Sequence, residues 1–189
     1  MASTVLFMSM SLDGFIAGPD DDHSQPIGAG GERLFDWSSS EPFAEESAQV
    51  HAEYDATGAV LAGRRTYDLV DGWGGDHHGV PVVIVTHAAP AKVPEGRSSF
   101  TFVTEGMSRA VALAKEAAGD KDVLVHGAEV AQQLLRAGLL DEIQLHLMPV
   151  LLGRGRRLFD RLGTDHIELE IVRVLDTPVA THLRYRIRR

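Results

Sequence analysis

Short apolar runs rich in β-branched residues alternate along this chain with segments of helical spacing. The clearest run, residues 80–86, is almost continuously apolar, as is typical of a strand that is covered on both faces. The runs that predict strands are residues 5–10, 59–62, 80–86, 100–103 and 123–125. The segments that predict helices are residues 42–54, 65–70, 108–118 and 128–137. Such alternation places parallel strands side by side with helices on both faces, so we predict an α/β fold.

The last quarter of the chain departs from this alternation. Residues 142–152 alternate apolar and polar side chains, which predicts a strand with one more polar face. Residues 167–175 and 179–187, joined by Asp176-Thr177-Pro178, predict an antiparallel hairpin. The sheet is therefore expected to be mostly parallel and to end in an antiparallel C-terminal hairpin. A length of 189 residues fits one domain, and we expect residues 1–189 to form it.

Composition excludes several classes of protein. The chain has no cysteine, so disulfides, thiol catalysis and thiolate metal sites are excluded. No window reaches the roughly 20 apolar residues of a membrane span, and residues 1–18 lack the basic start of a signal peptide. We therefore expect a cytoplasmic protein with no membrane partner. The net charge of -9 argues against nucleic-acid binding.

Charge is unevenly distributed along the chain. Arg33 is the only basic residue before residue 55, whereas arginines are concentrated after residue 150. Such asymmetry is usually a matter of solvated faces. Anion binding and subunit contact are the alternatives. Because the C-terminal strand is cationic, and residues 144–148 alternate in polarity, we expect a homodimer that uses these strands.

Ligands of open α/β sheets bind at the carboxyl ends of the strands, so the residues that follow each strand are candidates for a site. Gly63 and Gly127 each precede an expected helix, where free backbone N–H groups can hold phosphate oxygens. Arg64 and Arg65 oppose the helix dipole unless an anion lies nearby, and Thr66 adds a hydroxyl group. Two such places in one sheet predict a ligand with several phosphates, such as a dinucleotide. The alternative is a pair of helix caps with arginines bonded to the acidic N-terminal region.

Two common nucleotide motifs are missing. The chain has no Gly-x-Gly-x-x-Gly after its first strand and no Gly-x-x-x-x-Gly-Lys-Ser/Thr. An ordinary Rossmann site and a P-loop are therefore disfavoured.

Four motifs together resemble a known family. Residues 9–18 read SMSLDGFIAG and residues 63–67 read GRRTY, while residues 137–142 read AGLLDE and residues 149–155 read PVLLGRG, followed by Leu158-Phe159. In order and spacing they resemble dihydrofolate-reductase-like proteins related to the C-terminal reductase domain of the bifunctional riboflavin-biosynthesis deaminase-reductase. The resemblance covers about residues 3–187. It implies a three-layer dihydrofolate-reductase-like fold that binds NADPH and passes hydride to a heterocycle or its ribosyl-derived carbonyl or imine.

The resemblance also implies positions for the cofactor. Ser9, Ile16 and Ala17 would frame the nicotinamide. Gly63, Arg64, Arg65 and Thr66 would meet the pyrophosphate and the 2′-phosphate side, Thr86 and His87 the adenosine ribose phosphate, and Gly127, Ala128 and Glu129 would open a second phosphate-facing helix. His126 departs from the family, which usually has two consecutive glycines there. A side chain at this position could obstruct the backbone approach, or a histidine could donate to a phosphate.

The acceptor side offers fewer candidates. Asp13 follows the first strand at the ligand edge and is our first candidate for a catalytic and substrate-binding carboxylate, with an Asp-Gly turn as the alternative. Glu46, on the first expected helix, is the second catalytic candidate, with a solvated glutamate as the alternative. Trp73 could stack on a substrate, and Arg154, in a loop with Arg156, could meet a substrate phosphate. We expect no metal site, because His77-His78 lacks further ligands at suitable spacing and reads as a solvated loop.

These observations predict an NADPH-dependent reductase of a pyrimidine-like or pterin-like small molecule. The nearest named activity is reduction of 5-amino-6-(5-phosphoribosylamino)uracil in riboflavin biosynthesis. Reduction of dihydrofolate or of a xenobiotic carbonyl is the first alternative. A nucleotide-binding protein of the same fold without turnover is the second.

Overall fold

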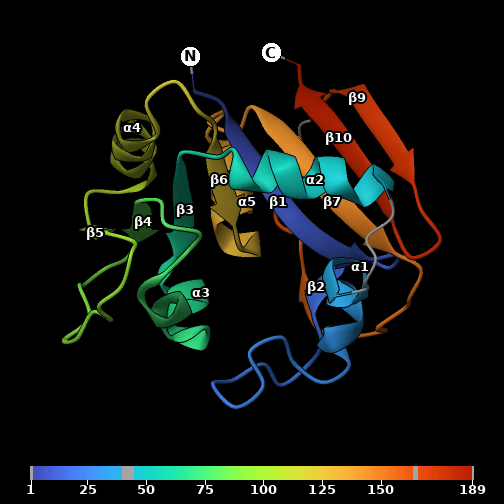
Figure 1. Ribbon diagram of the computed structural model, residues 1–189, viewed down its shortest axis with the longest axis horizontal. Coiled ribbons are helices and arrows are strands. Elements are labelled where there is room, and N and C mark those ends of the chain that lie inside the picture. Colours follow the sequence, from blue (N-terminus) through green and yellow to red (C-terminus); the bar gives the residue numbers. More distant parts are fainter. Residues whose placement is uncertain (1, 40–44, 164–165, 189) are drawn as a thin grey trace.

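An eight-stranded sheet forms the centre of the molecule, in the order β5-β4-β3-β6-β1-β7-β10-β9 (Figure 1). The computed structural model describes residues 2–39, 45–163 and 166–188, without the side chains of residues 39, 45 and 46. The strands are β1 (Thr4–Ser11), β3 (Ala59–Gly63), β4 (Val82–Val85), β5 (Phe100–Val103), β6 (Val123–His126), β7 (Glu142–Met148), β9 (Leu169–Asp176) and β10 (Thr181–Ile187). The strands from β5 to β7 run parallel, and β10 and β9 pair antiparallel at one edge. This confirms the predicted mostly parallel sheet with its C-terminal hairpin.

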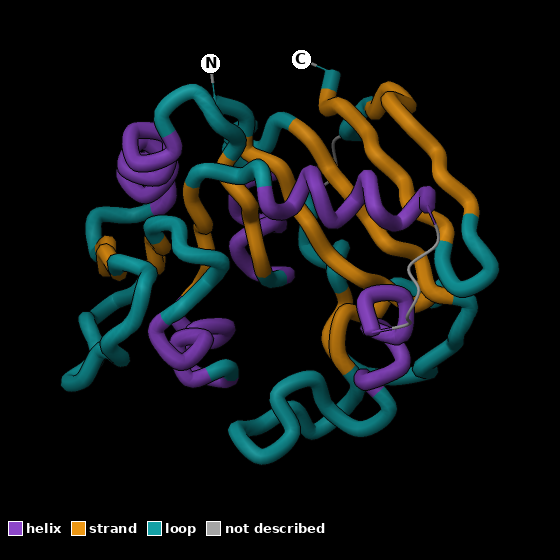
Figure 2. Tube along the Cα trace, in the orientation of Figure 1, coloured by secondary structure: helices purple, strands orange, loops and turns teal. Residues whose placement is uncertain are grey.

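Helices cover both faces of the sheet and bury two apolar cores. The helices α4 (Met107–Ala118) and α5 (Ala128–Arg136) pack on one face, and α2 (Glu45–Asp55) and α3 (Arg64–Leu69) on the other (Figure 2). Successive side chains of a strand point to opposite faces, so Leu6 enters the first core and Phe7 the second. The result is the expected three-layer fold. Within the described residues, no helix is long and apolar enough to cross a membrane.

The sequence of residues 18–41 is rich in Gly, Asp and Ser and predicts a loop, but the structure shows that part of it is helical. A 3-10 helix, η1 (Gly31–Phe35), leads into α1 (Asp36–Ser39), because Leu34 and Trp37 share one buried side three residues apart. The short strand β2 (Phe15–Ala17) pairs with β8 (Arg156–Arg157) outside the main sheet. The predicted helix start at Pro42 lies outside the described residues.

The strand predicted over residues 142–152 has the expected more polar face, but this face is buried within the chain. Gln144 is 1% and His146 is 0% exposed, because β7 lies between β1 and β10 and α2 covers this face. Gln144 donates to Glu53 Oε2 at 3.0 Å, and His146 Nδ1 lies 2.8 Å from His182 Nδ1. Buried polar partners explain the alternation, so this strand offers no subunit surface. The homodimer stays a prediction, and β9 is the edge strand of the C-terminal hairpin that could pair with a second copy.

The arginines of the C-terminal hairpin are neutralised within the chain. Arg173 and Arg184 pair with Glu53 of α2. Arg184 also pairs with Glu142 at 2.7 Å, as does Arg186 at 3.3 Å. Most of the positive charge in this part of the chain therefore balances internal carboxylates, so an anion site would have to use other arginines.

Candidate functional site

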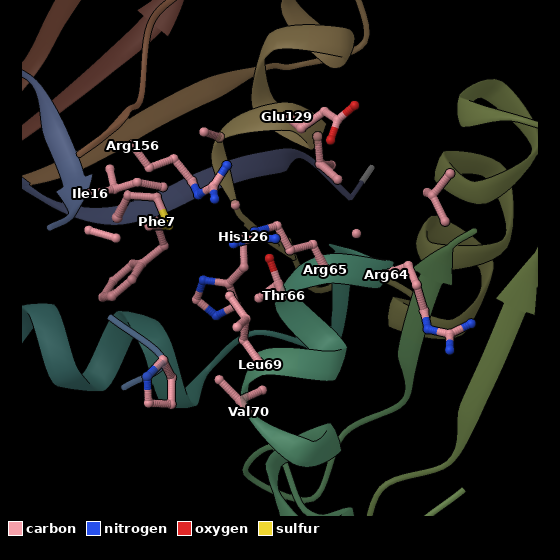
Figure 3. A pocket seen from close by; sticks show the side chains of 18 of the residues that line it. Phe7, Ile16, Arg64, Arg65, Thr66, Leu69, Val70, His126, Glu129 and Arg156 are labelled. Atoms are coloured by element: carbon pink, nitrogen blue, oxygen red, sulfur yellow. The ribbon is translucent and has the colours of Figure 1, made fainter. Parts of the chain in front are cut away.

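A pocket of about 950 Å³ opens where the carboxyl ends of β3, β4 and β6 reach the same edge of the sheet (Figure 3). Parallel strands bring the residues that follow them together, which is why distant motifs converge here. The predicted site residues that line the pocket are Ser9, Ile16, Ala17, Gly63, Arg64, Arg65, Thr66, Trp73, Thr86, His87, Gly127, Ala128 and Glu129.

Two helix starts meet in this pocket with very little space between them. Gly127, at the start of α5, has φ 92°, and a Cβ atom there would lie 2.8 Å from Thr66 Oγ1. A Cβ atom on Gly63 would lie 3.1 Å from Val130 Cγ2. No side chain caps the start of α5, so its first N–H groups stay available to an anion. The two glycines thus keep open a cradle that suits phosphate oxygens.

The two arginines of α3 point in different directions (Figure 3). Arg64 donates to Asp68 Oδ1 and to the carbonyl oxygen of Ala88, both at 2.7 Å, and lies toward β4. Arg65 instead reaches Asp21, to whose Oδ2 its Nη2 lies at 3.0 Å. The alternative reading, in which an arginine bonds to the acidic N-terminal region, is therefore correct for Arg65.

Of Arg154 and Arg156, both in the segment after β7, Arg156 lines the pocket and Arg154 does not. Arg154 is exposed and does not line the pocket, whereas Arg156 does. Its position follows from the pairing of β8 with β2, which places Arg156 opposite Ala17. Arg156 also binds Asp21, so the carboxylate of Asp21 joins arginines from two walls of the pocket.

Beyond the cradle, the pocket widens into a chamber lined by rings. These come from Phe7, Trp37, His51, Tyr54, Trp73 and His77. Trp37 donates from Nε1 to Ser9 Oγ at 2.8 Å, so the hydroxyl group of Ser9 positions an aromatic wall. Sequence reasoning missed Trp37 because it lies in the expected loop, where the spacing of Leu34 and Trp37 was the available signal. Flat aromatic surfaces of this kind suit a planar heterocycle.

A chain of three histidines runs from this chamber toward the surface. His77 Nε2 lies 3.1 Å from His126 Nε2, and His77 Nδ1 lies 2.7 Å from His78 Nδ1. The Nε2 atom of His78 lies 3.0 Å from Thr57 Oγ1. Since His77 is only 3% exposed, the predicted solvated His77-His78 loop is wrong for His77. The ring of His126 contacts His77 and forms part of the pocket lining next to Gly127.

Burial keeps the two inner histidines neutral. Desolvation lowers the pKa of His77 to about 2 and that of His126 to about 4. A neutral imidazole has one donor and one acceptor nitrogen, so its partners fix which nitrogen holds the proton. The two close contacts of the His77 ring, to His126 Nε2 and to His78 Nδ1, therefore each join one N–H donor to one acceptor nitrogen. In one of the two arrangements that satisfy both contacts, His126 Nε2 accepts from His77 Nε2–H, and His77 Nδ1 accepts from His78 Nδ1–H.

A strained turn holds Trp73 and His77 against the chamber. In η2 (Asp71–Gly75), Asp71 has φ 47° and Trp73 has φ 52°, which are left-handed conformations that cost a non-glycine residue roughly 1–2 kcal/mol each. Packing opposes this strain: a Cβ atom on Gly75 would lie 2.3 Å from the carbonyl oxygen of Glu95, and the backbone N–H of His77 donates to Ser98 Oγ at 2.9 Å. Strain of this kind is concentrated at functional sites.

Asp13, the first carboxylate expected to be catalytic, lies outside the pocket lining. Asp13 accepts from Ser11 Oγ at 2.6 Å and from the backbone N–H groups of Leu152 and Gly153, and it does not line the pocket. The hydrogen bond from Ser11, helped by those from the two N–H groups, holds the pKa of Asp13 below its ordinary value. Asp13 thus fastens the turn after β1 to the loop after β7. The side chain of Glu46 lies outside the described residues. Among the described residues, no group of three or more histidine or acidic side chains could hold a metal ion.

We predict that Asp13→Ala lowers the melting temperature by a few degrees and leaves turnover nearly unchanged. The loss of three accepted hydrogen bonds loosens the loop after β7, while the pocket keeps its lining. Thermal unfolding followed by circular dichroism, together with kcat, checks this. Asp160→Ala, at an exposed position, is the control. A large loss of kcat at an unchanged melting temperature would restore Asp13 to the mechanism.

Residues 2–183 match the RibD C-terminal domain family. The chain is 26% identical over 194 residues to the uncharacterized protein YwjB of Bacillus subtilis (strain 168), with 96% of each chain covered. Its structure is similar to that of a putative riboflavin biosynthesis protein from Shewanella sp. PV-4, with a TM-score of 0.76, 21% identity and 99% of each chain covered.

A second similar structure belongs to a larger protein. It is the diaminohydroxyphosphoribosylaminopyrimidine deaminase/5-amino-6-(5-phosphoribosylamino)uracil reductase of Thermotoga maritima, with a TM-score of 0.64 and 15% identity. The match covers 98% of this chain and 56% of that one. Together these matches confirm the resemblance that the sequence motifs indicated.

Proposed function

The chain belongs to the RibD C-terminal domain family, and from this we propose that it is an NADPH-dependent reductase of a pyrimidine-like heterocycle or its ribosyl-derived chain. The observation that carries the proposal is the continuity of one pocket, in which the glycine cradle opens into the ring-lined chamber. Reduction of 5-amino-6-(5-phosphoribosylamino)uracil is the nearest named activity.

The cradle fits the phosphates of NADPH. The backbone from Gly127 to Glu129 would hold the pyrophosphate with the hydroxyl group of Thr66, and Arg64 would lie beside the 2′-phosphate. Thr86 and His87 would border the adenosine ribose. Ile16 and Ala17, both buried in β2, would frame the nicotinamide at the entrance of the chamber. When bound, NADPH supplies the hydride.

The chain's own residues supply the proton that reduction requires. Hydride adds to the carbon of a C=N or C=O group, and the π-electron pair moves to the heteroatom, which takes a proton. In this proposal His77 Nε2–H gives that proton when the acceptor replaces His126 as its partner. His77 Nδ1 takes a proton from His78 Nδ1 at the same time, so a protonated His78 ends neutral. Because burial lowers the pKa of His77, its ring does not stay protonated on both nitrogens. It can still take up a proton on one nitrogen while it releases one from the other.

The chamber favours some acceptors over others. A 2-amino-4-oxopteridine presents two adjacent N–H donors that a carboxylate would accept. Among the described lining residues the carboxylates are Asp21, which is paired with arginines, and Glu129 on α5. A pyrimidinedione presents both carbonyl acceptors and N–H donors along one edge. Neutral imidazoles can serve both, because each has one donor and one acceptor nitrogen. This places dihydrofolate and xenobiotic carbonyls second, and a protein without turnover third.

NADPH binding and a panel of acceptors test the proposal. We expect NADPH to quench tryptophan fluorescence at micromolar concentration, because Trp37 and Trp73 line the pocket, and to bind more tightly than NADH. Arg64→Gln should remove that preference, with exposed Arg109→Gln as the control. NADPH oxidation is then measured with the phosphoribosylaminouracil, dihydrofolate and simple ketones. Failure to bind NADPH at millimolar concentration would exclude both proposed activities, the reduction of a pyrimidine-like acceptor and that of dihydrofolate or a carbonyl compound.

A further inference from the structure

Three charged side chains meet across the mouth of the pocket. Arg156 lies 2.9 Å from Asp21 Oδ2 through Nη2 and 3.0 Å from Oδ1, so its contact is bidentate. Arg65 Nη2 lies 3.0 Å from the same Oδ2 atom. Figure 3 shows Arg65 and Arg156 reaching inward from opposite sides of the pocket. The carboxylate of Asp21 is 12% exposed, so it lies between the two guanidinium groups rather than in solvent.

The charges of this cluster do not balance. Two guanidinium groups carry two positive charges, and one carboxylate compensates one of them. In the part of the chain that the structure describes, the contacts of Arg65 and Arg156 all go to Asp21, through its carboxylate and, for Arg65, also its carbonyl oxygen. A phosphate group carries up to two negative charges and three acceptor oxygens, so it matches two arginines better than a carboxylate does.

Asp21 sits on a loop whose base is fixed and whose tip is held by the arginines. At the base, Gly18 N–H donates to the carbonyl oxygen of Ile27 and Ala29 N–H to that of Pro19, each at 2.9 Å. A Cβ atom on Gly18 would lie 1.9 Å from the carbonyl oxygen of Ala29, so the two segments that form the base of the loop are in contact. The loop extends from β2 toward α3 below the sheet (Figure 1). The carboxylate can therefore leave the arginines while the base stays closed.

From this geometry we propose that Arg65 and Arg156 form one anion site for a phosphate group of the ligand, and that Asp21 occupies this site in the free protein. Binding then exchanges a carboxylate for a phosphate on the same two arginines, and Asp21 weakens binding by competing for them. The proposal deepens the proposed function and rests on it.

Two phosphates could reach this site. Arg65 is next to Thr66 in α3, on the side of the cradle where the pyrophosphate of a dinucleotide would lie. Arg156 lies in β8 opposite Ala17, on the side of the chamber where the acceptor would bind. The pyrophosphate of the cofactor and a phosphate monoester on the acceptor share the same chemistry. They can be distinguished by using NADPH, reduced nicotinamide mononucleotide and ribose 5-phosphate as separate probes.

Asp21→Asn is the decisive variant, because it removes the charge and keeps the shape. We expect it to tighten phosphate binding by about threefold to tenfold, as the loss of a partly buried competing ion pair implies. Asp20→Asn is the matched control, since Asp20 is exposed on the same loop and asparagine tolerates its φ of 61°. Arg156→Gln should weaken binding of the same probe. The double variant that also carries Asp21→Asn should bind the probe little more tightly than Arg156→Gln alone. Dissociation constants are measured by calorimetry, with circular dichroism to confirm folding.

The outcomes separate this inference from the proposed function. Tighter binding of NADPH and the mononucleotide supports the site with the cofactor as source, and tighter binding of ribose 5-phosphate alone supports it with the acceptor as source. If every variant binds all three probes as wild type does, while wild type binds NADPH, this inference is wrong and the reductase proposal stands. If neither wild type nor Asp21→Asn binds any of the three probes, both proposals fail.

Discussion

His77→Gln is expected to lower kcat by on the order of 100-fold, the usual contribution of a positioned general acid. Glutamine can still donate a hydrogen bond toward His126, but an amide cannot accept a proton on one atom while it releases one from another. The pocket lining should stay intact, so the dissociation constant of NADPH should change by less than about twofold. Single-turnover kinetics with NADPH and the acceptor found in the panel measure the chemical step directly, separate from binding.

Two comparisons make this result interpretable. His166→Gln is the control, because His166 is exposed and far along the chain from the chamber residues. A merely structural role for His77 would lower the melting temperature without affecting the solvent isotope effect on the chemical step. Wild-type kcat in a folded His77→Gln protein would exclude the histidine chain as the proton route.

The three linked histidines also predict that the rate of the chemical step depends on pH. Burial lowers the pKa of His78 from its ordinary value of 6.5, while Asp55 and Asp76 oppose this shift. The other groups that face His78 are His77, Tyr54 and Thr57. Because the protonated ring is the proton source, its fraction grows as the pH falls below about 6.5. The rate of the chemical step should therefore rise toward acid pH, and His78→Gln should lose this rise.

Gly127→Ala is expected to raise the dissociation constant of NADPH by on the order of tenfold to 100-fold. The new Cβ atom would lie 2.8 Å from Thr66 Oγ1, so the start of α5 or Thr66 must move away from the phosphate position. Displacements of about 1 Å at a binding site have effects of this size. Fluorescence titration with NADPH measures the change.

Gly138→Ala provides a matched control at the other end of α5. Gly138 also has a positive φ, 63°, but a Cβ atom there would meet nothing within 4 Å. Both variants place an alanine at a positive φ, and the backbone strain is larger at Gly127, whose ψ of 143° lies near a region that glycine alone adopts readily. Only Gly127→Ala also narrows the cradle. Equal loss of NADPH affinity in both variants would show that backbone strain, rather than the cradle, is responsible.

The sequence predicted the parallel sheet and its ligand edge because both depend on local patterns. A β-branched run such as residues 80–86 reads as a buried strand wherever it occurs, and the residue after a parallel strand faces the ligand edge by geometry alone. Gly63, Thr66 and Gly127 could therefore be placed before the structure was known.

The residues that sequence reasoning missed depend on contacts between distant segments. His77 is buried because Ser98 binds its backbone and His126 faces its ring, and neither neighbour can be inferred from a His-His dipeptide. Arg156 enters the pocket only through the pairing of β8 with β2. Polar alternation in β7 suggested a subunit surface, because the pattern does not reveal that α2 covers this face within the chain.

The position of β1 has a consequence for how the chain folds during synthesis. Its partners are β6, where Thr4 pairs with Val123, and β7, where Val5 pairs with Glu142. Within this domain the central strand is therefore synthesised before both of its partners, and it must wait for them before either of its edges is paired. Contacts this distant in sequence slow folding, and an unpaired apolar strand is exposed meanwhile. Chains interrupted before β7 would have an incomplete sheet, so we expect them to aggregate or be degraded instead of folding in part.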